Sequence, residues 1–280
     1  MPTFETPDPI SATLQLVAGD VRISAGDRAA TTVEVVPSDP ASEEDRRAAE
    51  LTRVEYADGR LLVKAPRLRS WRARSHGGAI GLTIELPAGS SLHADADLAD
   101  LACDGPLGDC RIKTGIGRIE VDSASGVNLR SGIGDIAVGR ASGHVDINSG
   151  SGEIRVGELG STGVIKNSNG DTWVGVATGD LRVRAANGSI SVDESRATVG
   201  AKSANGDVRL RDIRGSVVME TSLGDLEIGI PDGIAAYLDV RASAGRVHNE
   251  LEAAEAPGEA AEKVEVRGRT AAGDVLIRRP

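Results

Sequence analysis

The sequence predicts an all-β fold, a single-stranded parallel β-helix or β-solenoid with about 18 residues per coil and capping strands at both ends. Three observations support this prediction. Glycine is abundant while aromatic residues are scarce, a short apolar motif recurs about every nine residues, and certain polar residues recur only every 18. The coil therefore contains two similar but not identical halves.

The composition favours a core of small aliphatic side chains. The chain has 280 residues, of which 40% are apolar, and this is enough for a sizeable core. The 35 glycines show no three-residue period, which excludes collagen. A conventional sandwich rarely has so few aromatic residues, which are Phe4, Tyr56, Trp71, Trp173 and Tyr237.

The recurring motif reads glycine, polar, aliphatic, variable, aliphatic, as in Gly117–Val121 and Gly206–Leu210. Its two aliphatic residues lie on one face of a strand, because side chains alternate with period two. Glycine two residues before most of these pairs predicts a tight turn before every strand. The predicted inward pairs are Ile119/Val121, Val127/Leu129, Ile136/Val138, Val145/Ile147, Ile154/Val156, Val164/Lys166, Thr172/Val174, Leu181/Val183, Ile190/Val192, Val199/Ala201, Val208/Leu210, Val217/Met219 and Leu226/Ile228.

Two columns of residues occur only once per 18 residues, and they set the coil length. Successive coils stack about 4.8 Å apart, so equivalent side chains lie on one another. Asn169, Asn187 and Asn205 should form a buried ladder in which each amide bonds the next. One column reads Thr114, Ser131, Ser149, Ser168, Ala185, Ser203, Thr221, and the other reads Ile116, Ile133, Ser151, Asn169, Asn187, Asn205, Leu223.

The chain should divide into an N-terminal β-rich cap continuous with the solenoid (1–91), the repeat solenoid (92–230), and C-terminal solenoid strands with a cap (231–280). In the first part, Asp58-Gly59 predicts a hairpin, and Asp39-Pro40 followed by acidic residues predicts a short helix to about Leu51. In the last part, 244–247 and 272–277 resemble further solenoid strands around an acidic loop at 252–262.

The repeated units, together with a strand-rich lead-in that ends in Leu86-Pro87-Ala88-Gly89, resemble the bacterial "putative adhesin" β-strand-repeat family of unknown function. The resemblance covers nearly the whole chain. It implies a toast-rack-like domain similar to a single-stranded β-helix, of the kind linked to envelope stress and cell-surface contexts. It implies no catalytic residues.

Charge and hydropathy limit the partners and the compartment. A net charge of −10 argues against nucleic acid, since phosphate binding needs a basic footprint. One local basic cluster surrounds Trp71 and comprises Lys64, Arg67, Arg69, Arg72 and Arg74.

Met1 to Leu16 lacks the basic start and apolar run of a signal peptide, and no segment reaches the ~20 apolar residues of a membrane span. We therefore expect a cytoplasmic protein without membrane insertion, and the sequence does not specify an oligomeric state.

The expected function is a non-enzymatic scaffold for protein–protein interaction that needs no cofactor. A carbohydrate-binding or polysaccharide-active β-helix is the alternative, but it would need clustered carboxylates in an aromatic-lined groove. A calcium-binding β-roll is the lesser alternative, because its motif needs paired glycines that no coil here has. Outward acidic residues occur at equivalent positions of several coils, where a solvated, turn-capping role is expected: Asp135, Glu153, Asp171, Asp207 and Asp225.

Trp173 is the candidate binding residue. Its neighbours in the strand point inward, so Trp173 points outward, next to Arg155 in the preceding coil. An exposed tryptophan beside an arginine is typical of interaction hot spots. A tryptophan that lies flat on the sheet against Arg155 as a cation–π pair, or under a terminal segment, is the alternative. Cys103 and Cys110 occupy apolar positions of the repeat and are expected to be buried and reduced, and no residue is expected to bind metal or act in catalysis.

Overall fold

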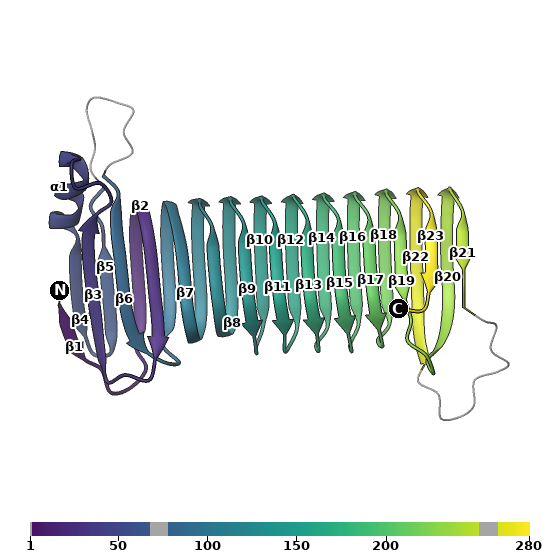
Figure 1. Cartoon of the computed structure of the whole chain (residues 1–280), viewed down its shortest axis with the longest axis horizontal. Helices are drawn as coiled ribbons and strands as arrows, with labels where there is room; N and C mark the ends of the chain where they lie inside the picture. The colour runs from purple at the N-terminus through teal and green to yellow at the C-terminus, as the bar shows by residue number, and fades with distance from the viewer. Residues whose placement is uncertain (1, 68–77, 252–262) are drawn as a thin grey trace. The chain divides into compact units, whose positions relative to one another are not determined.

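The computed structural model describes residues 2–67, 78–251 and 263–280. The chain forms two compact units, Met1–Ser142 and Gly143–Pro280, and the division falls inside the predicted 92–230 segment. Nearly all of the described residues with regular structure belong to β-strands (Figure 1).

The N-terminal unit is built from parallel strands that stack in register. The strands are β2 (Ser11–Gly26), β7 (Ser91–Ile116), β8 (Ile119–Ile133) and β9 (Ile136–Ala141). The solenoid register begins earlier than the predicted repeat, because Ala12 pairs with Leu92 and Ile23 with Cys103. Residues 11–26 therefore form a full coil rather than only a lead-in.

A set of parallel and antiparallel strands covers the first edge of this unit. The strands β5 (Arg60–Lys64) and β6 (Ile80–Pro87) pair in parallel with β2, and β4 (Arg53–Ala57) and β3 (Ala30–Pro37) pair antiparallel with them. The short strand β1 (Thr3–Glu5) pairs with β3. The predicted hairpin is confirmed, with positive φ at both Asp58 and Gly59. Such strands satisfy backbone groups that a parallel edge would leave open.

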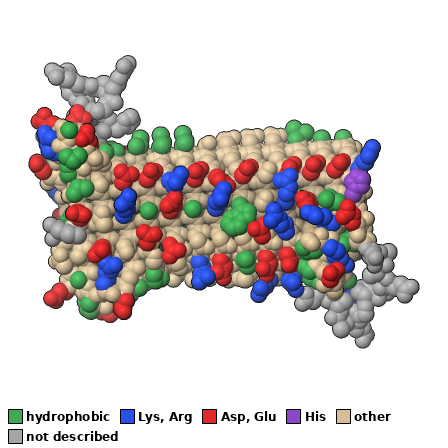
Figure 2. Space-filling model, in the orientation of Figure 1, with side chains coloured by type: hydrophobic (Ala, Val, Ile, Leu, Met, Phe, Trp, Pro, Cys, Tyr) green, Lys and Arg blue, Asp and Glu red, His purple; other side chains and the backbone are tan. Residues whose placement is uncertain are grey.

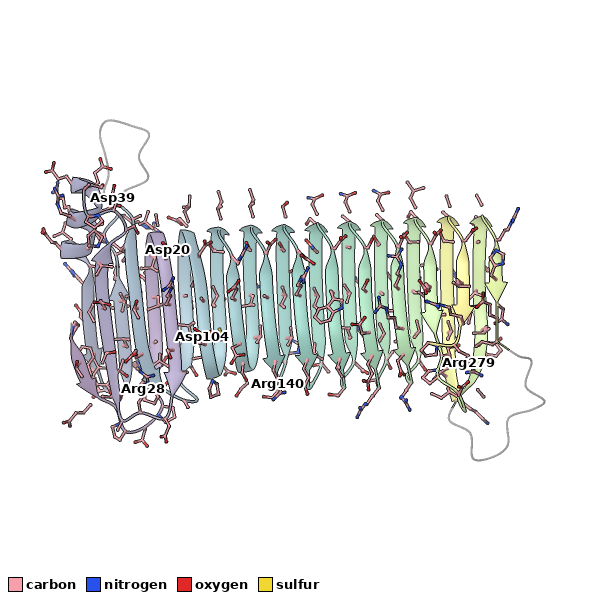
Figure 3. The ribbon with its side chains drawn as sticks, in the orientation of Figure 1. Asp20, Arg28, Asp39, Asp104, Arg140 and Arg279 are labelled. Atoms are coloured by element: carbon pink, nitrogen blue, oxygen red, sulfur yellow. The ribbon has the colours of Figure 1, made fainter. Side chains whose placement is uncertain are left out.

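The predicted helix is confirmed as α1 (Glu43–Leu51). Its N-cap is Ser42, whose hydroxyl accepts the N–H of Asp45 at 3.2 Å, whereas the Asp39 carboxylate accepts the N–H of Ala41 just before the helix (Figure 3). The acidic first turn suits the positive end of the helix dipole. Among the described residues, no helix is long and apolar enough to cross a membrane.

The C-terminal unit shows the two-stranded coil of 18 residues most regularly. One face consists of β10 (Val145–Ser151), β12 (Gly163–Asn169), β14 (Leu181–Asn187), β16 (Val199–Asn205) and β18 (Val217–Leu223). The other face consists of β11 (Ile154–Leu159), β13 (Thr172–Ala177), β15 (Ile190–Ser195), β17 (Val208–Ile213) and β19 (Leu226–Gly229). The predicted class, a parallel β-helix or β-solenoid, is confirmed. Aliphatic residues such as Ile154, Leu181 and Leu210 fill the interior.

Only one of the two turns in each coil holds its glycine at positive φ. Gly188, Gly206 and Gly224 have φ between 141° and 144°, whereas Gly179 and Gly215, which lie in the other turn, are not in the positive-φ region. A Cβ on Gly206 would also lie 2.2 Å from the carbonyl oxygen of Gly188 in the preceding coil. Glycine is therefore needed at the first turn for both its φ and the close stacking of coils.

The predicted register is wrong in one strand. In β12 the inward positions are Gly163, Ile165 and Asn167, while Val164 is only half-buried and Lys166 is exposed. The polar column accordingly contains Asn167, not Ser168. Because Val164 and Ile165 are both aliphatic and Gly163 has no side chain, the apolar pattern alone fits either register.

The buried polar column binds the turn backbone. Thr221 Oγ1 donates to the carbonyl of Gly206 at 2.9 Å, and Ser203 Oγ donates to that of Gly188 at 3.0 Å. Asn167 Nδ2 makes equivalent bonds, at 2.9 Å, to the carbonyls of Gly152 and Gly170. These side chains satisfy carbonyls at the turns that the strand ladder does not reach.

The C-terminal strands complete the unit in an order that differs from the chain order. The strands β20 (Ala235–Ala244) and β21 (Val247–Asn249) pair with β22 (Lys263–Ala272) and β23 (Val275–Arg278), which in turn pair with β18 and β19 (Figure 1). The predicted strands near 244–247 and 272–277 are thus present. After β23, Arg279 donates to the carbonyls of Ile230 and Pro231 (Figure 3).

Candidate functional site

Trp173 lies on an outward column of the C-terminal unit. Strand pairing places it between Arg155 and Ser191, and Arg209 and Glu227 continue the column. In this unit, charged side chains follow the coils in rows (Figure 2). Trp173 therefore lies on the outer face next to Arg155, as the sequence predicts.

The Trp173 ring is half-buried and held against the sheet. Its Nε1 donates a hydrogen bond to Asp193 Oδ2 at 3.0 Å, and Asp193 also pairs with Arg211 at 3.4 Å. A Cβ on Gly175 would lie 3.1 Å from Cη2 of Trp173, so the ring lies over this glycine. Because Gly175 has no side chain, the Trp173 ring can lie over it, and the hydrogen bond to Asp193 fixes the orientation of the ring.

Arg155 is anchored by a carboxylate of its own coil. Its guanidinium donates to both carboxylate oxygens of Glu153, at 2.8 and 3.1 Å. This bidentate geometry holds the exposed Arg155 side chain beside the strand that carries Trp173. The pair Trp173 and Arg155 is thus presented on one face, with each side chain oriented by an acidic neighbour.

The outward acidic column binds backbone between coils. The Oδ1 atom of Asp171 accepts the N–H of Ser189 at 2.8 Å, and that of Asp207 accepts the N–H of Asp225 at 2.9 Å. In the N-terminal unit, Asp100 accepts the N–H of Arg118 in the same way. Each of these carboxylates links one coil to the next through a backbone N–H group, which agrees with a structural role.

The asparagine ladder stacks in register but is exposed. Asn187 Nδ2 donates to Asn169 Oδ1 at 2.9 Å, and Asn205 Nδ2 donates to Asn187 Oδ1 at 2.8 Å. All three side chains lie on the solvent side of the turn, so the expectation of a buried ladder is wrong. The repeat period reveals that residues stack but not whether their column faces inward.

Asn187→Leu should therefore destabilise the protein only mildly. Two exposed side-chain hydrogen bonds are lost, and water replaces them, so we expect a loss of about 0.5–1.5 kcal/mol. Leucine itself is tolerated at this site, because Leu223 is 57% exposed in the same column. Urea unfolding followed by circular dichroism measures the change, and a loss above about 3 kcal/mol would contradict the exposed position.

Cys103 and Cys110 meet inside the N-terminal unit. Both are free thiols with side chains that are 2% exposed, as predicted for their burial. A hydrogen bond between the two side chains, together with burial, raises the pKa of the Cys103 thiol well above its usual value. Cys103 is thus held in its unreactive, protonated form.

Neither thiol should react with a maleimide in the native protein at neutral pH. We expect labelling at least ~100-fold slower than for Ser125→Cys, a control thiol at an exposed position of the same unit. Both native thiols should react at once in denaturant. Mass spectrometry of timed samples measures the rates, and rapid native labelling would overturn the buried placement.

Two other sequence expectations concern metals and the basic cluster. Among residues 2–67, 78–251 and 263–280, no group of three or more His, Cys, Asp or Glu side chains could hold a metal ion. Arg69, Trp71, Arg72 and Arg74 of the basic cluster lie outside the described residues, as does the acidic loop at 252–262.

The coils and columns define a parallel β-solenoid repeat protein whose outward side chains stack at one position per coil. Residues 13–279 match the model of the Toastrack DUF4097 family. The chain belongs to this family, which confirms the resemblance seen in the sequence.

Two solved structures are similar over nearly their whole length. A "putative cell adhesion protein" from Clostridium sporogenes ATCC 15579 is 13% identical, with a TM-score of 0.23, 100% of this chain covered and 98% of that one. A "putative adhesin" from Bacteroides fragilis NCTC 9343 is 10% identical, with a TM-score of 0.28 and coverages of 99% and 95%. No curated protein matches the chain.

Proposed function

We propose that this protein is a non-enzymatic scaffold that binds a partner protein through the face around Trp173. The observation that carries the proposal is the fixed orientation of this tryptophan. Its ring lies over Gly175 and its N–H is bound by Asp193, while part of the side chain remains accessible. A preoriented tryptophan loses little conformational entropy on binding.

The surroundings of Trp173 suit a protein partner better than a catalytic centre. Arg155 and Arg209 lie in the same column and offer planar donors to carboxylates or carbonyls. The nearby Asp171 and Asp207 carboxylates accept backbone hydrogen bonds, so they lack the poised, unshared arrangement of a general acid and base. This supports the assignment of the scaffold as non-enzymatic.

We propose the cytoplasm as the compartment. Support comes from two free thiols that contact each other in the core, because such a pair stays reduced where glutathione and thioredoxin operate. Alkylation of thiols during lysis of the native host, followed by mass spectrometry, should find both cysteines alkylated. An oxidised pair would indicate an oxidising compartment instead.

Fluorescence tests the accessibility of Trp173. In a Trp71→Phe background, Trp173 is the sole indole, and acrylamide should quench it partially, between the values for a free and a buried tryptophan. An unquenchable, blue-shifted emission would show that the ring is covered within the chain, and the binding proposal would fail.

Affinity capture from the native host tests the binding itself. Trp173→Ala should abolish recovery of the partner seen with the unaltered chain, while Trp173→Phe should retain part of it. Arg267→Ala, an exposed position on the other face of the same unit, is the matched control and should leave recovery unchanged. Loss of the partner with Arg267→Ala but not with Trp173→Ala would place the interaction elsewhere.

A further inference from the structure

A column of basic side chains runs along the face of the C-terminal unit that is formed by β12, β14, β16, β18, β22 and β20. Strand pairing puts one residue of each strand in direct succession. Since the coils are about 4.8 Å apart, the column presents charges at a regular spacing. In order along the column, the residues are Lys166, Arg184, Lys202, Glu220, Arg269 and Arg241.

Several of these cations are free to bind a ligand. Lys202 pairs with Glu220 at 2.7 Å, and Arg241 pairs with Asp239 at 3.5 Å. Lys166, Arg184 and Arg269 are exposed and form no ion pair with any residue that the structure describes. The column thus concentrates five cations and one carboxylate in a chain whose net charge is −10. Such a local excess attracts anions in spite of the overall charge.

Grooves flank the column on both sides. One groove has a volume of about 520 Å³, and Ala204, Ser222 and Ser243 lie in it beside the basic side chains. The other has a volume of about 280 Å³ and includes Gly200 and Arg182. The small residues leave room for a chain-like ligand to lie against the sheet, with the basic side chains reaching its anionic groups.

We propose that this basic column binds a linear acidic polysaccharide whose sugar rings carry carboxylates. The step between coils is comparable to the length of one pyranose ring, so a uronic-acid chain that lies along the column has about one sugar at each coil. Successive sugars are rotated about the chain axis, and the long, exposed side chains of Lys166, Arg184 and Arg269 can reach carboxylates on either side of it. Arginine binds carboxylates through two parallel hydrogen bonds, which suits Arg184 and Arg269. Repeated weak contacts along one chain combine into a high avidity.

Nucleic acid fits the column less well. Along the axis of duplex DNA the phosphates of one strand recur about every 3.4 Å, which does not match the coil spacing of about 4.8 Å. Single-stranded nucleic acid also needs aromatic platforms for its bases, and none of the six column positions is aromatic.

This site is separate from the Trp173 face, because its strands form the other side of each coil. A failure of the Trp173 proposal therefore leaves it unaffected. The polysaccharide site is tested with purified whole chain and defined polymers, so no partner from the host is needed.

Titration of the whole chain with polyuronate fragments of increasing length tests the proposal. Affinity should rise at least 10-fold from dimer to hexamer, and neutral dextran should not bind. The double variant Arg184→Gln, Lys202→Gln should weaken hexamer binding at least 10-fold. The matched double variant Arg155→Gln, Arg209→Gln, which removes two cations from the Trp173 face, should change it less than twofold.

Other outcomes would overturn the proposal. Absence of polyuronate binding, or an equal effect of the two double variants, would show that the column is not a site. Tighter binding of single-stranded DNA or polyglutamate than of polyuronate at equal charge would assign it to another polyanion. Unchanged melting temperatures of both double variants are required, and Lys166→Gln with Arg184→Gln serves as a second pair if the first one unfolds.

Discussion

Gly206→Ala is expected to destabilise the C-terminal unit by about 3–5 kcal/mol. Gly206 has a φ of 144°, which side-chain-bearing residues rarely adopt, and its Cβ would lie 2.2 Å from the carbonyl oxygen of Gly188. The Cβ is fixed to the backbone of one coil and the oxygen belongs to the backbone of the coil before it, so neither atom can move without disturbing the ladder. The strain and the steric conflict therefore add.

Gly200→Ala is the matched control in the same strand series. Its Cβ would find only Arg182 Cγ at 3.8 Å and Leu181 O at 3.9 Å, and its φ is not in the positive region. Alanine there should be neutral or stabilise by up to about 1 kcal/mol, because glycine weakens a strand interior. Urea unfolding of both variants measures the difference. Equal stabilities would refute the close approach of the coils at Gly206.

Asn167→Leu is expected to destabilise by about 2–4 kcal/mol. Asn167 is 3% exposed, and its amide donates to the carbonyls of Gly152 and Gly170. Leucine would leave both acceptors buried without a donor, and its side chain is larger than that of asparagine at a tightly packed turn. The loss of hydrogen bonding therefore dominates over any gain from apolar burial.

Asn167→Thr separates hydrogen bonding from shape at this position. Thr221, at the equivalent place in another coil, donates to Gly206 O at 2.9 Å. Threonine can therefore replace one of the amide bonds, and it removes Asn167 Oδ1, which has no hydrogen-bond partner among the described residues. We expect a change within about 1 kcal/mol. If threonine and leucine were equally harmful, the polar column would not act through its hydrogen bonds.

The fold could be predicted because every coil repeats the same physical requirements. The inward aliphatic pairs and the glycines at one turn recur at fixed spacing, and both follow from strand alternation and backbone sterics. The prediction failed at β12, where Val164 and Ile165 are both aliphatic and where glycine occupies an inward position. Only the stacking of Asn167 on Ser149 in the preceding coil resolves that register.

The candidate site could be predicted only in part. Alternation places Trp173 outside, but its partner Asp193 lies 20 residues further along, in the next coil. A spacing of one coil plus two residues could have pointed to this contact. The basic column was missed although its members in β12, β14 and β16 lie 18 residues apart, because the incorrect register placed Lys166 inside. The exposure of the asparagine ladder depends on the direction of the turn, which periodicity does not specify.

The order of the last strands constrains how the chain can fold. Most coils of the C-terminal unit can form on the coil made just before them, from the N-terminal side onwards. Residues 235–249 cannot, since their native neighbour is the coil of residues 263–278, which is synthesised later. That later coil must then pair with β18 and β19. Residues 235–249 follow β19 directly in the sequence, so they can contact these two strands before the later coil does. Completion of this end therefore requires a non-sequential step, and premature pairing of 235–249 with β18 is the competing reaction that slows it.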